Sequence, residues 1–163
     1  MQEQLSKLGF HPDPFGPSIC RYKIGDVPID IIPSSDSPIG QSNRWYKVGM
    51  DNLIVTEVHG QDIQILPAPC FLATKFEAFN GRGKDYRTSH DMEDIIYVID
   101  NRTTIVDEIE TAQMEIRDFI QSELKKIVEN GLLDEMLICH IHPLMLADRM
   151  PLVQGKIEEI LNL

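Results

Sequence analysis

Hydrophobic and polar residues alternate in short runs through the first part of the chain, and the spacing becomes helical near residue 69. The runs ICRYKIGDVPIDIIP (19–33) and LIVTEVHGQDIQILPAP (53–69) carry β-branched and aromatic residues on both sides of turn residues. This pattern predicts two β-hairpins, with turns at Gly25–Asp26 and at residues 59–62. The stretch SSDSPIGQSN (34–43) between them is rich in turn-forming residues and predicts a loop.

Apolar residues after position 69 recur every three or four residues, which predicts a helical second half. The expected helices span 69–80, 89–100, 103–110, 112–129, 132–140 and 151–162. Shorter helices are expected at RWYKVG (44–49) and at the N-terminus, where Gly9 ends the helix. Strands followed by helices indicate an α+β (mixed α/β) fold. We expect one domain, in which residues 1–100 form the core and the helices of 101–163 pack on it.

The length and composition are those of a folded protein of the cytoplasm. A chain of 163 residues is long enough to bury about 70% of its unfolded surface. The three cysteines, Cys20, Cys70 and Cys139, include no C-x-x-C pair, which favours reduced thiols. The N-terminus has no basic head before an apolar stretch, and no segment approaches about 18 uninterrupted apolar residues. We therefore expect neither a signal peptide nor a membrane span.

Charge is unevenly distributed along the chain. The formal net charge of −11 disfavours general binding to DNA or RNA backbone, which needs an excess of Lys and Arg. Residues 91–135 hold thirteen Asp or Glu against four Lys or Arg, whereas residues 75–87 hold four basic residues against two acidic ones. An anion site is therefore expected in the second stretch.

Four ionisable residues lie on the faces that the two helices of residues 69–100 should bury. On a helical wheel, Lys75 and Arg82 share an arc with apolar residues of the first helix. Asp91 and Asp94 share an arc with Ile95 and Val98 in the second helix. These residues form either ion pairs that join the two helices or a functional site. Buried ion pairs add little net stability, which favours function.

The start of the second helix offers a further structural interpretation. Thr88 and Asp91 fit the capping box T-x-x-D. On that interpretation, Asp91 and His90 serve only the first helical turn.

Two weaker candidates for metal binding lie elsewhere in the sequence. Asp30 interrupts an apolar strand, where it either faces a metal ion or lies on an exposed strand face. The motif CHIH supplies Cys139, His140 and His142, which are donors for a transition metal. A helix end that enters a loop explains the CHIH motif equally well.

The pattern K-x-x-A-F-x-G-R-G, followed by D-Y and S-H-D-x-x-D-I, resembles the C-terminal motif block of nucleotidyltransferase-fold proteins related to the AbiEii abortive-infection toxins. The block covers residues 75–95, and the similarity extends to ICRYKIGDVPIDIIP, SNRWY and LPAPCFLATKFEAF. The resemblance thus covers most of residues 1–100. It implies a nucleotidyltransferase-like mixed β-sheet with helices.

The resemblance also implies an activity and a set of site residues. Family members transfer a nucleotidyl group from an NTP with the help of Mg²⁺ or Mn²⁺. Asp30 resembles the third metal carboxylate, Lys75 the lysine near the triphosphate, and Asp91 and Asp94 the acidic pair of the following motif. Arg82, Asp85 and His90 occupy matching positions of the nucleotide-binding block. The acceptor would be RNA or protein, and an antitoxin is an expected partner.

The chain departs from the family pattern at the first motif, a glycine turn followed by Asp-x-Asp or Asp-x-Glu. No Asp-x-Asp occurs, and the single Asp-x-Glu, Asp91 to Glu93, lies in a predicted helix, where residues two apart diverge. We therefore expect an N-terminally truncated fold whose first motif has been lost, is supplied by another chain, or is absent from a degenerate relative. An exposed sheet edge would then favour a homodimer.

Two functions follow as alternatives. The first is metal-dependent NMP transfer, provided that the missing motif is supplied. The second is a catalytically inactive binding module, in which the same charged residues hold the helices together.

Overall fold

The computed structural model describes residues 2–16, 19–33, 43–82 and 85–163, and it divides the chain into two compact units, Met1–Ser42 and Asn43–Leu163. The division falls well before the boundary at residue 100 that the sequence suggests. The predicted loop at 34–43 lies outside the described residues except for Asn43. Helices and small sheets occur together, which confirms the α+β class.

The first unit contains a short helix and a three-stranded antiparallel sheet in the order β1-β2-β3. Its elements are α1 (Gln2–Lys7), β1 (His11–Pro12), β2 (Arg21–Ile24) and β3 (Val27–Asp30). Gly9 ends α1 as predicted, with a φ of 85°, a left-handed conformation that glycine adopts without strain. The β2–β3 turn lies at Gly25–Asp26, so that Arg21 faces Asp30 across the two strands.

The second unit consists of a hairpin and a bundle of helices. The hairpin strands are β4 (Ile54–Val58) and β5 (Gln61–Ile65), joined by His59 and Gly60, which both have positive φ. The helices are α2 (Arg44–Met50), α3 (Ala68–Arg82), α4 (His90–Asn101), α5 (Ile105–Glu110), α6 (Met114–Glu129), α7 (Leu133–His140) and α8 (Leu146–Leu161), with a 3₁₀ turn, η1 (Pro143–Met145), before α8. All five strands among the described residues pair antiparallel in two separate sheets, in place of the one mixed sheet that the family resemblance implies.

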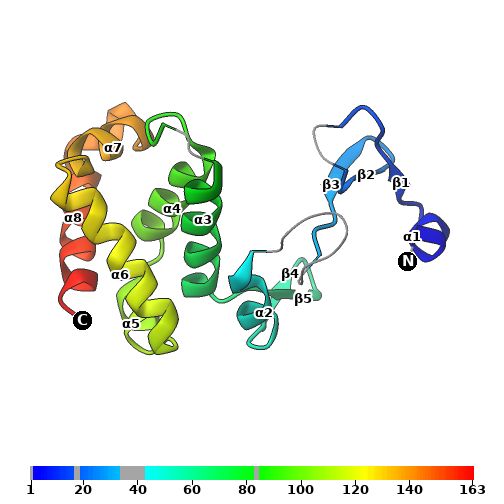
Figure 1. Cartoon of the computed structure of the whole chain (residues 1–163), viewed down its shortest axis with the longest axis horizontal. Helices are drawn as coiled ribbons and strands as arrows, with labels where there is room; N and C mark the ends of the chain where they lie inside the picture. The colour runs from blue at the N-terminus through cyan, green and yellow to red at the C-terminus, as the bar shows by residue number, and fades with distance from the viewer. Residues whose placement is uncertain (1, 17–18, 34–42, 83–84) are drawn as a thin grey trace. The chain divides into compact units, whose positions relative to one another are not determined.

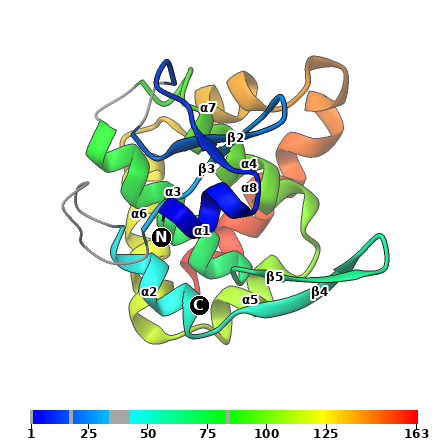
Figure 2. The ribbon, with the colours of Figure 1, turned by 90° about the vertical axis from the view of Figure 1, so that its right-hand side faces the viewer.

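Helix α3 packs against α2, α4 and α6, and α8 packs against α4, α5 and α6 (Figure 1). Phe76 and Leu72 of α3 and Ile95 and Ile99 of α4 are completely or almost completely buried. The buried residues of α6 and α8 complete the same hydrophobic core. The β4–β5 hairpin extends away from these helices (Figure 2). In the part of the chain that the structure describes, no helix combines the length and apolar character needed to cross a membrane.

Side chains of α8 bind the C-terminal end of α4. The Lys156 ammonium donates to the backbone carbonyls of Ile99, Asp100 and Arg102 at 2.6, 2.9 and 3.1 Å. Arg149 bonds both the carboxylate and the carbonyl of Asp100. These cations satisfy carbonyls that have no partner inside the helix, and they oppose the negative end of its dipole.

Candidate functional site

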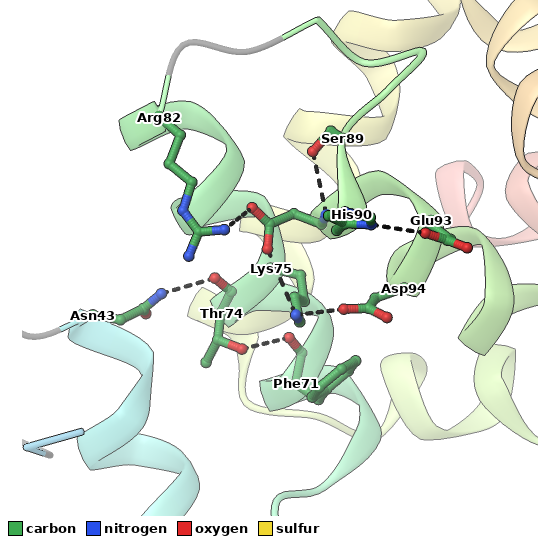
Figure 3. Close-up of polar contacts among 10 residues, drawn as sticks. Asn43, Phe71, Thr74, Lys75, Arg82, Ser89, His90, Glu93 and Asp94 are labelled. Carbon is green, nitrogen blue, oxygen red and sulfur yellow. Dashed lines mark hydrogen bonds and ion pairs between the residues drawn. The ribbon is translucent and has the colours of Figure 1, made fainter. Parts of the chain in front are cut away.

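The charged residues predicted on the facing sides of α3 and α4 do meet. We call Lys75, Arg82, Asp91 and Asp94 the α3–α4 cluster (Figure 3). The Lys75 ammonium lies 2.5 Å from the Asp94 carboxylate and 3.6 Å from that of Asp91. The Arg82 guanidinium donates to the second oxygen of Asp91 at 2.7 Å. One carboxylate thus holds two cations that lie seven residues apart on α3.

Burial differs sharply between the members of the cluster. The Asp91 side chain is 4% exposed, whereas Lys75 is 25%, Asp94 46% and Arg82 56% exposed. Asp91 is therefore the buried centre of the cluster, and the other three side chains reach solvent. The Lys75 ammonium also lies 5.4 Å from the centre of the Phe71 ring, within the range of a cation–π interaction.

The position of Asp91 depends on the start of α4. Ser89 is the N-cap, and its hydroxyl accepts a hydrogen bond from the Asp91 backbone N–H at 3.2 Å. The capping box predicted at Thr88 is wrong by one residue, because Thr88 lies in the turn before the cap. Glu93 points away from Asp91 and bonds the His90 ring at 3.1 Å. As expected from helical geometry, Asp91 and Glu93 do not converge.

Two residues assigned to nucleotide binding by the resemblance lie outside the α3–α4 cluster. The His90 side chain is 93% exposed and pairs with Glu93. Asp85 is bound by the guanidinium and the backbone N–H of Arg87. Hydrogen bonds from Arg87 lower the Asp85 pKa to about 2. Both side chains thus pair with residues two or three positions away in the sequence and not with members of the cluster.

Asp30 belongs to the first unit, whereas the residues of the α3–α4 cluster belong to the second. Its carboxylate accepts two hydrogen bonds from the Arg21 guanidinium, one of them at 2.8 Å. This pairing lowers the Asp30 pKa. Arg21 is a partner that periodicity does not predict, but the register of the hairpin does: counting outward from the turn at Gly25–Asp26 places Arg21 opposite Asp30.

The Mg²⁺ or Mn²⁺ that the resemblance implies does not fit these residues. Both oxygens of Asp91 face cations of α3, and Asp30 is occupied by Arg21. Within the described ranges, no group of three or more His, Cys, Asp or Glu is arranged to hold a metal ion.

The same finding covers the CHIH motif. The His140 Nε2 lies 2.7 Å from the Tyr86 carbonyl, and the His142 ring accepts from the Leu144 N–H at the start of η1. Cys139 is exposed. The two histidines hold a loop and begin a turn, which agrees with the helix-end interpretation.

A second set of polar contacts near the cluster involves residues that the sequence analysis did not select. The Asn43 side chain donates to the Thr74 carbonyl at 2.8 Å and accepts from the Trp45 N–H at the start of α2. The Thr74 hydroxyl in turn bonds the Phe71 carbonyl at 2.7 Å (Figure 3). These bonds fix α2 against the turn of α3 that carries Lys75.

Comparisons with protein-family models, curated proteins and solved structures find no match for this chain.

Proposed function

We propose that the chain is a nucleotidyltransferase-like protein that binds the phosphates of an NTP at the α3–α4 cluster. One observation carries the proposal: Lys75 and Arg82 converge on the buried Asp91 while their own side chains stay partly exposed to solvent. A buried carboxylate that fixes two cations in place prepares them for an anion, because their positions need no reorganisation when the ligand arrives. The family resemblance of residues 75–95 gives the ligand class.

The exposure gradient suggests how phosphate would enter. Asp94 is the more exposed partner of Lys75, so its pairing is the one that solvent and competing anions weaken most. A phosphate oxygen takes the place of Asp94 at the Lys75 ammonium, and a second oxygen accepts from the free N–H groups of Arg82. Asp91 remains between the two cations and keeps them from moving apart.

The reaction implied by the resemblance is transfer of NMP from the NTP to RNA or protein. The described residues do not fit the divalent metal of that reaction, so the proposal for this chain concerns nucleotide binding by Lys75 and Arg82. An antitoxin and a second copy of the chain are the protein partners that the proposal includes.

Calorimetric titration with each of the four NTPs, in the presence of Mg²⁺, tests the proposal. Lys75→Met removes the ammonium and keeps an apolar stem, and we expect affinity to fall about tenfold or more, since a charge-assisted hydrogen bond contributes about 1.5–3 kcal/mol. Lys125→Met is the matched control, because Lys125 is an exposed lysine of α6 whose ion pair, among the described residues, is with Glu129. Equal affinity of both variants would contradict the proposal.

The variant Asp94→Asn tests whether Asp94 competes with phosphate for Lys75 or itself takes part in binding the nucleotide. If Asp94 competes with phosphate for Lys75, removing its charge strengthens NTP binding. Weaker binding of the Mg²⁺–NTP complex by Asp94→Asn would instead make Asp94 part of the nucleotide site, as the resemblance implies.

The second candidate function is a non-catalytic binding module, which the pairing within the cluster favours. All four members have an oppositely charged partner inside the protein, so the cluster also joins α3 to α4. On this alternative, Lys75→Met lowers the melting temperature and no NTP binds. On the nucleotide proposal, Asp91 keeps Arg82 as its partner in Lys75→Met, and the loss appears mainly in binding.

A further inference from the structure

An open groove of about 790 Å³ lies between the β4–β5 hairpin and helices α3 and α4. We call it the hairpin groove. Its apolar wall includes Ile54 and Ile65 of the hairpin, Phe71 of α3 and Val98 of α4. Small-molecule sites have volumes of about 300–1,000 Å³ and combine apolar walls with a few polar groups.

The hairpin groove adjoins the α3–α4 cluster at Phe71. Phe71 lies one helical turn before Lys75, and Val98 lies one turn after Asp94, so each pair shares a face of its helix. The Lys75 ammonium is 5.4 Å from the centre of the Phe71 ring, which lines the groove. Figure 3 shows Phe71 next to Lys75, on the side of the cluster where Asp94 lies. Cations thus border one end of an apolar groove.

The polar groups of the groove are mostly uncharged. Thr56 of β4, Asn101 at the end of α4, and Thr103 and Thr104 between α4 and α5 contribute hydroxyl and amide groups. Arg102 is the one charged residue among the described residues of the lining, and its Nε donates to Glu108 at 2.7 Å. Tyr97 adds an aromatic ring that is largely exposed.

We propose that the hairpin groove binds the nucleoside part of an NTP whose phosphates bind Lys75 and Arg82. This inference rests on the proposed function and extends it from the phosphates to the base. The charge pattern fits such a ligand, because a nucleotide is anionic at one end and a flat, uncharged aromatic base at the other. Bases stack on aromatic side chains such as Phe71 and Tyr97, and uncharged hydroxyl and amide groups suit the edges of a base.

The test compares each NTP with inorganic triphosphate by calorimetric titration of the full chain, in the same Mg²⁺ buffer. We expect the NTP to bind at least about tenfold more tightly than inorganic triphosphate, and Tyr97→Ala to remove about tenfold of NTP affinity. Inorganic triphosphate should bind wild type and Tyr97→Ala equally. Thr56→Trp provides a second variant on another element, because it fills the groove with a side chain that strands accept. Tyr46→Ala removes the same ring from α2, outside the groove lining, and should change neither affinity.

The outcomes separate this inference from the proposed function. One outcome is that NTP and inorganic triphosphate bind equally, that Tyr97→Ala and Thr56→Trp change neither affinity, and that Lys75→Met abolishes both. This outcome would overturn the nucleoside groove but support the phosphate site. A parallel loss of both ligands in the groove variants would also overturn it. Absence of binding by either ligand to wild type would overturn both proposals.

Discussion

Two aspartates of the α3–α4 region show how much the surroundings of a carboxylate decide its role. Asp91 is buried between Lys75 and Arg82, so that its charge organises residues of another helix. Asp85 is exposed and is bound by Arg87, two residues away. The first carboxylate fixes a tertiary contact, whereas the second shapes a local turn.

The pairing of Asp85 with Arg87 has a measurable pH dependence. Hydrogen bonds from the guanidinium, and then from the Arg87 backbone N–H, lower the Asp85 pKa from the usual 3.8 to about 2. The folded-state pKa is below the unfolded one, so the stabilisation is fully present above about pH 4 and is lost as the pH falls through about 2. We expect carbon-13 NMR titration of the carboxyl group to give a midpoint near 2 and Arg87→Gln to raise it toward 3.8.

Arg102→Gln is the control for that titration, since Arg102 pairs with Glu108 and not with Asp85. An Asp85 midpoint that stays near 2 in Arg87→Gln would show that the backbone bond alone holds the carboxylate, contrary to the prediction.

At the scale of single residues, the sequence predicts the α3–α4 cluster but not the partners of Asp85 and Asp30. Helical periodicity was enough to place Lys75, Arg82, Asp91 and Asp94 on facing sides, because residues three, four and seven apart share a face in any α-helix. The partners of Asp85 and Asp30 depend on the conformation of a turn and the register of a hairpin. Helical or strand periodicity gives no information on either the turn conformation or the hairpin register.

Both ends of helix α4 are bound by side chains from other helices. Lys75 and Arg82 of α3 reach its first turn, and Arg149 and Lys156 of α8 reach its last. The Asp91 carboxylate in the first turn, and the Arg149 and Lys156 cations at the last, have the signs of charge that stabilise a helix through its dipole. Lys75 and Arg82 act at the first turn by pairing with Asp91. The arrangement fixes the position of α4 between α3 and α8.

Replacing Lys156 should therefore weaken the bundle. Burial lowers the Lys156 pKa, which reflects how far its ammonium has left solvent to reach the three carbonyls. Lys156→Met keeps most of the apolar stem and removes the donor, and we expect the free energy of unfolding to fall by about 1–2 kcal/mol. Urea unfolding measures the change. The exposed Lys125→Met serves again as the control, and equal midpoints for the two variants would refute the capping role.

The sequence predicts which helices and strands exist more accurately than it predicts their first residues. Helical spacing places the last helix at 151–162, but α8 begins at Leu146 and contains Pro151. The η1 turn runs directly into α8, so the helix is already formed when the chain reaches the proline. The strands were found as hairpins, but alternation within a strand does not say which strands share a sheet.

At the scale of the whole molecule, the hydrophobic core belongs to the second unit. Its buried members run from Trp45 to Ile160, whereas Tyr22 is the buried hydrophobic residue among the described part of the first unit. The sequence predicts a loop at 34–43, where the division falls, but periodicity does not tell which apolar residues on its two sides pack together.

Residues 43–163 should consequently fold alone. We expect this fragment to retain the helical circular dichroism of α2–α8 and to unfold cooperatively, because no described residue of the first unit belongs to its hydrophobic core. Leu124→Ala, at a fully buried position of α6, should destabilise the fragment and the full chain equally, by about 3 kcal/mol. A fragment that melts without cooperativity would show that residues 1–42 contribute to the core.

The stacking at the start of α2 provides an optical signal for such measurements. Trp45 is the single tryptophan of the chain, and it is buried with its ring 5.0 Å from Phe119 of α6 and with Arg44 over its face at 4.5 Å. All tryptophan fluorescence of this protein therefore originates at the junction of α2 and α6. A shift of its emission toward longer wavelength reports water reaching that junction, so that loosening of α2 can be followed separately from the loss of helix in the bundle.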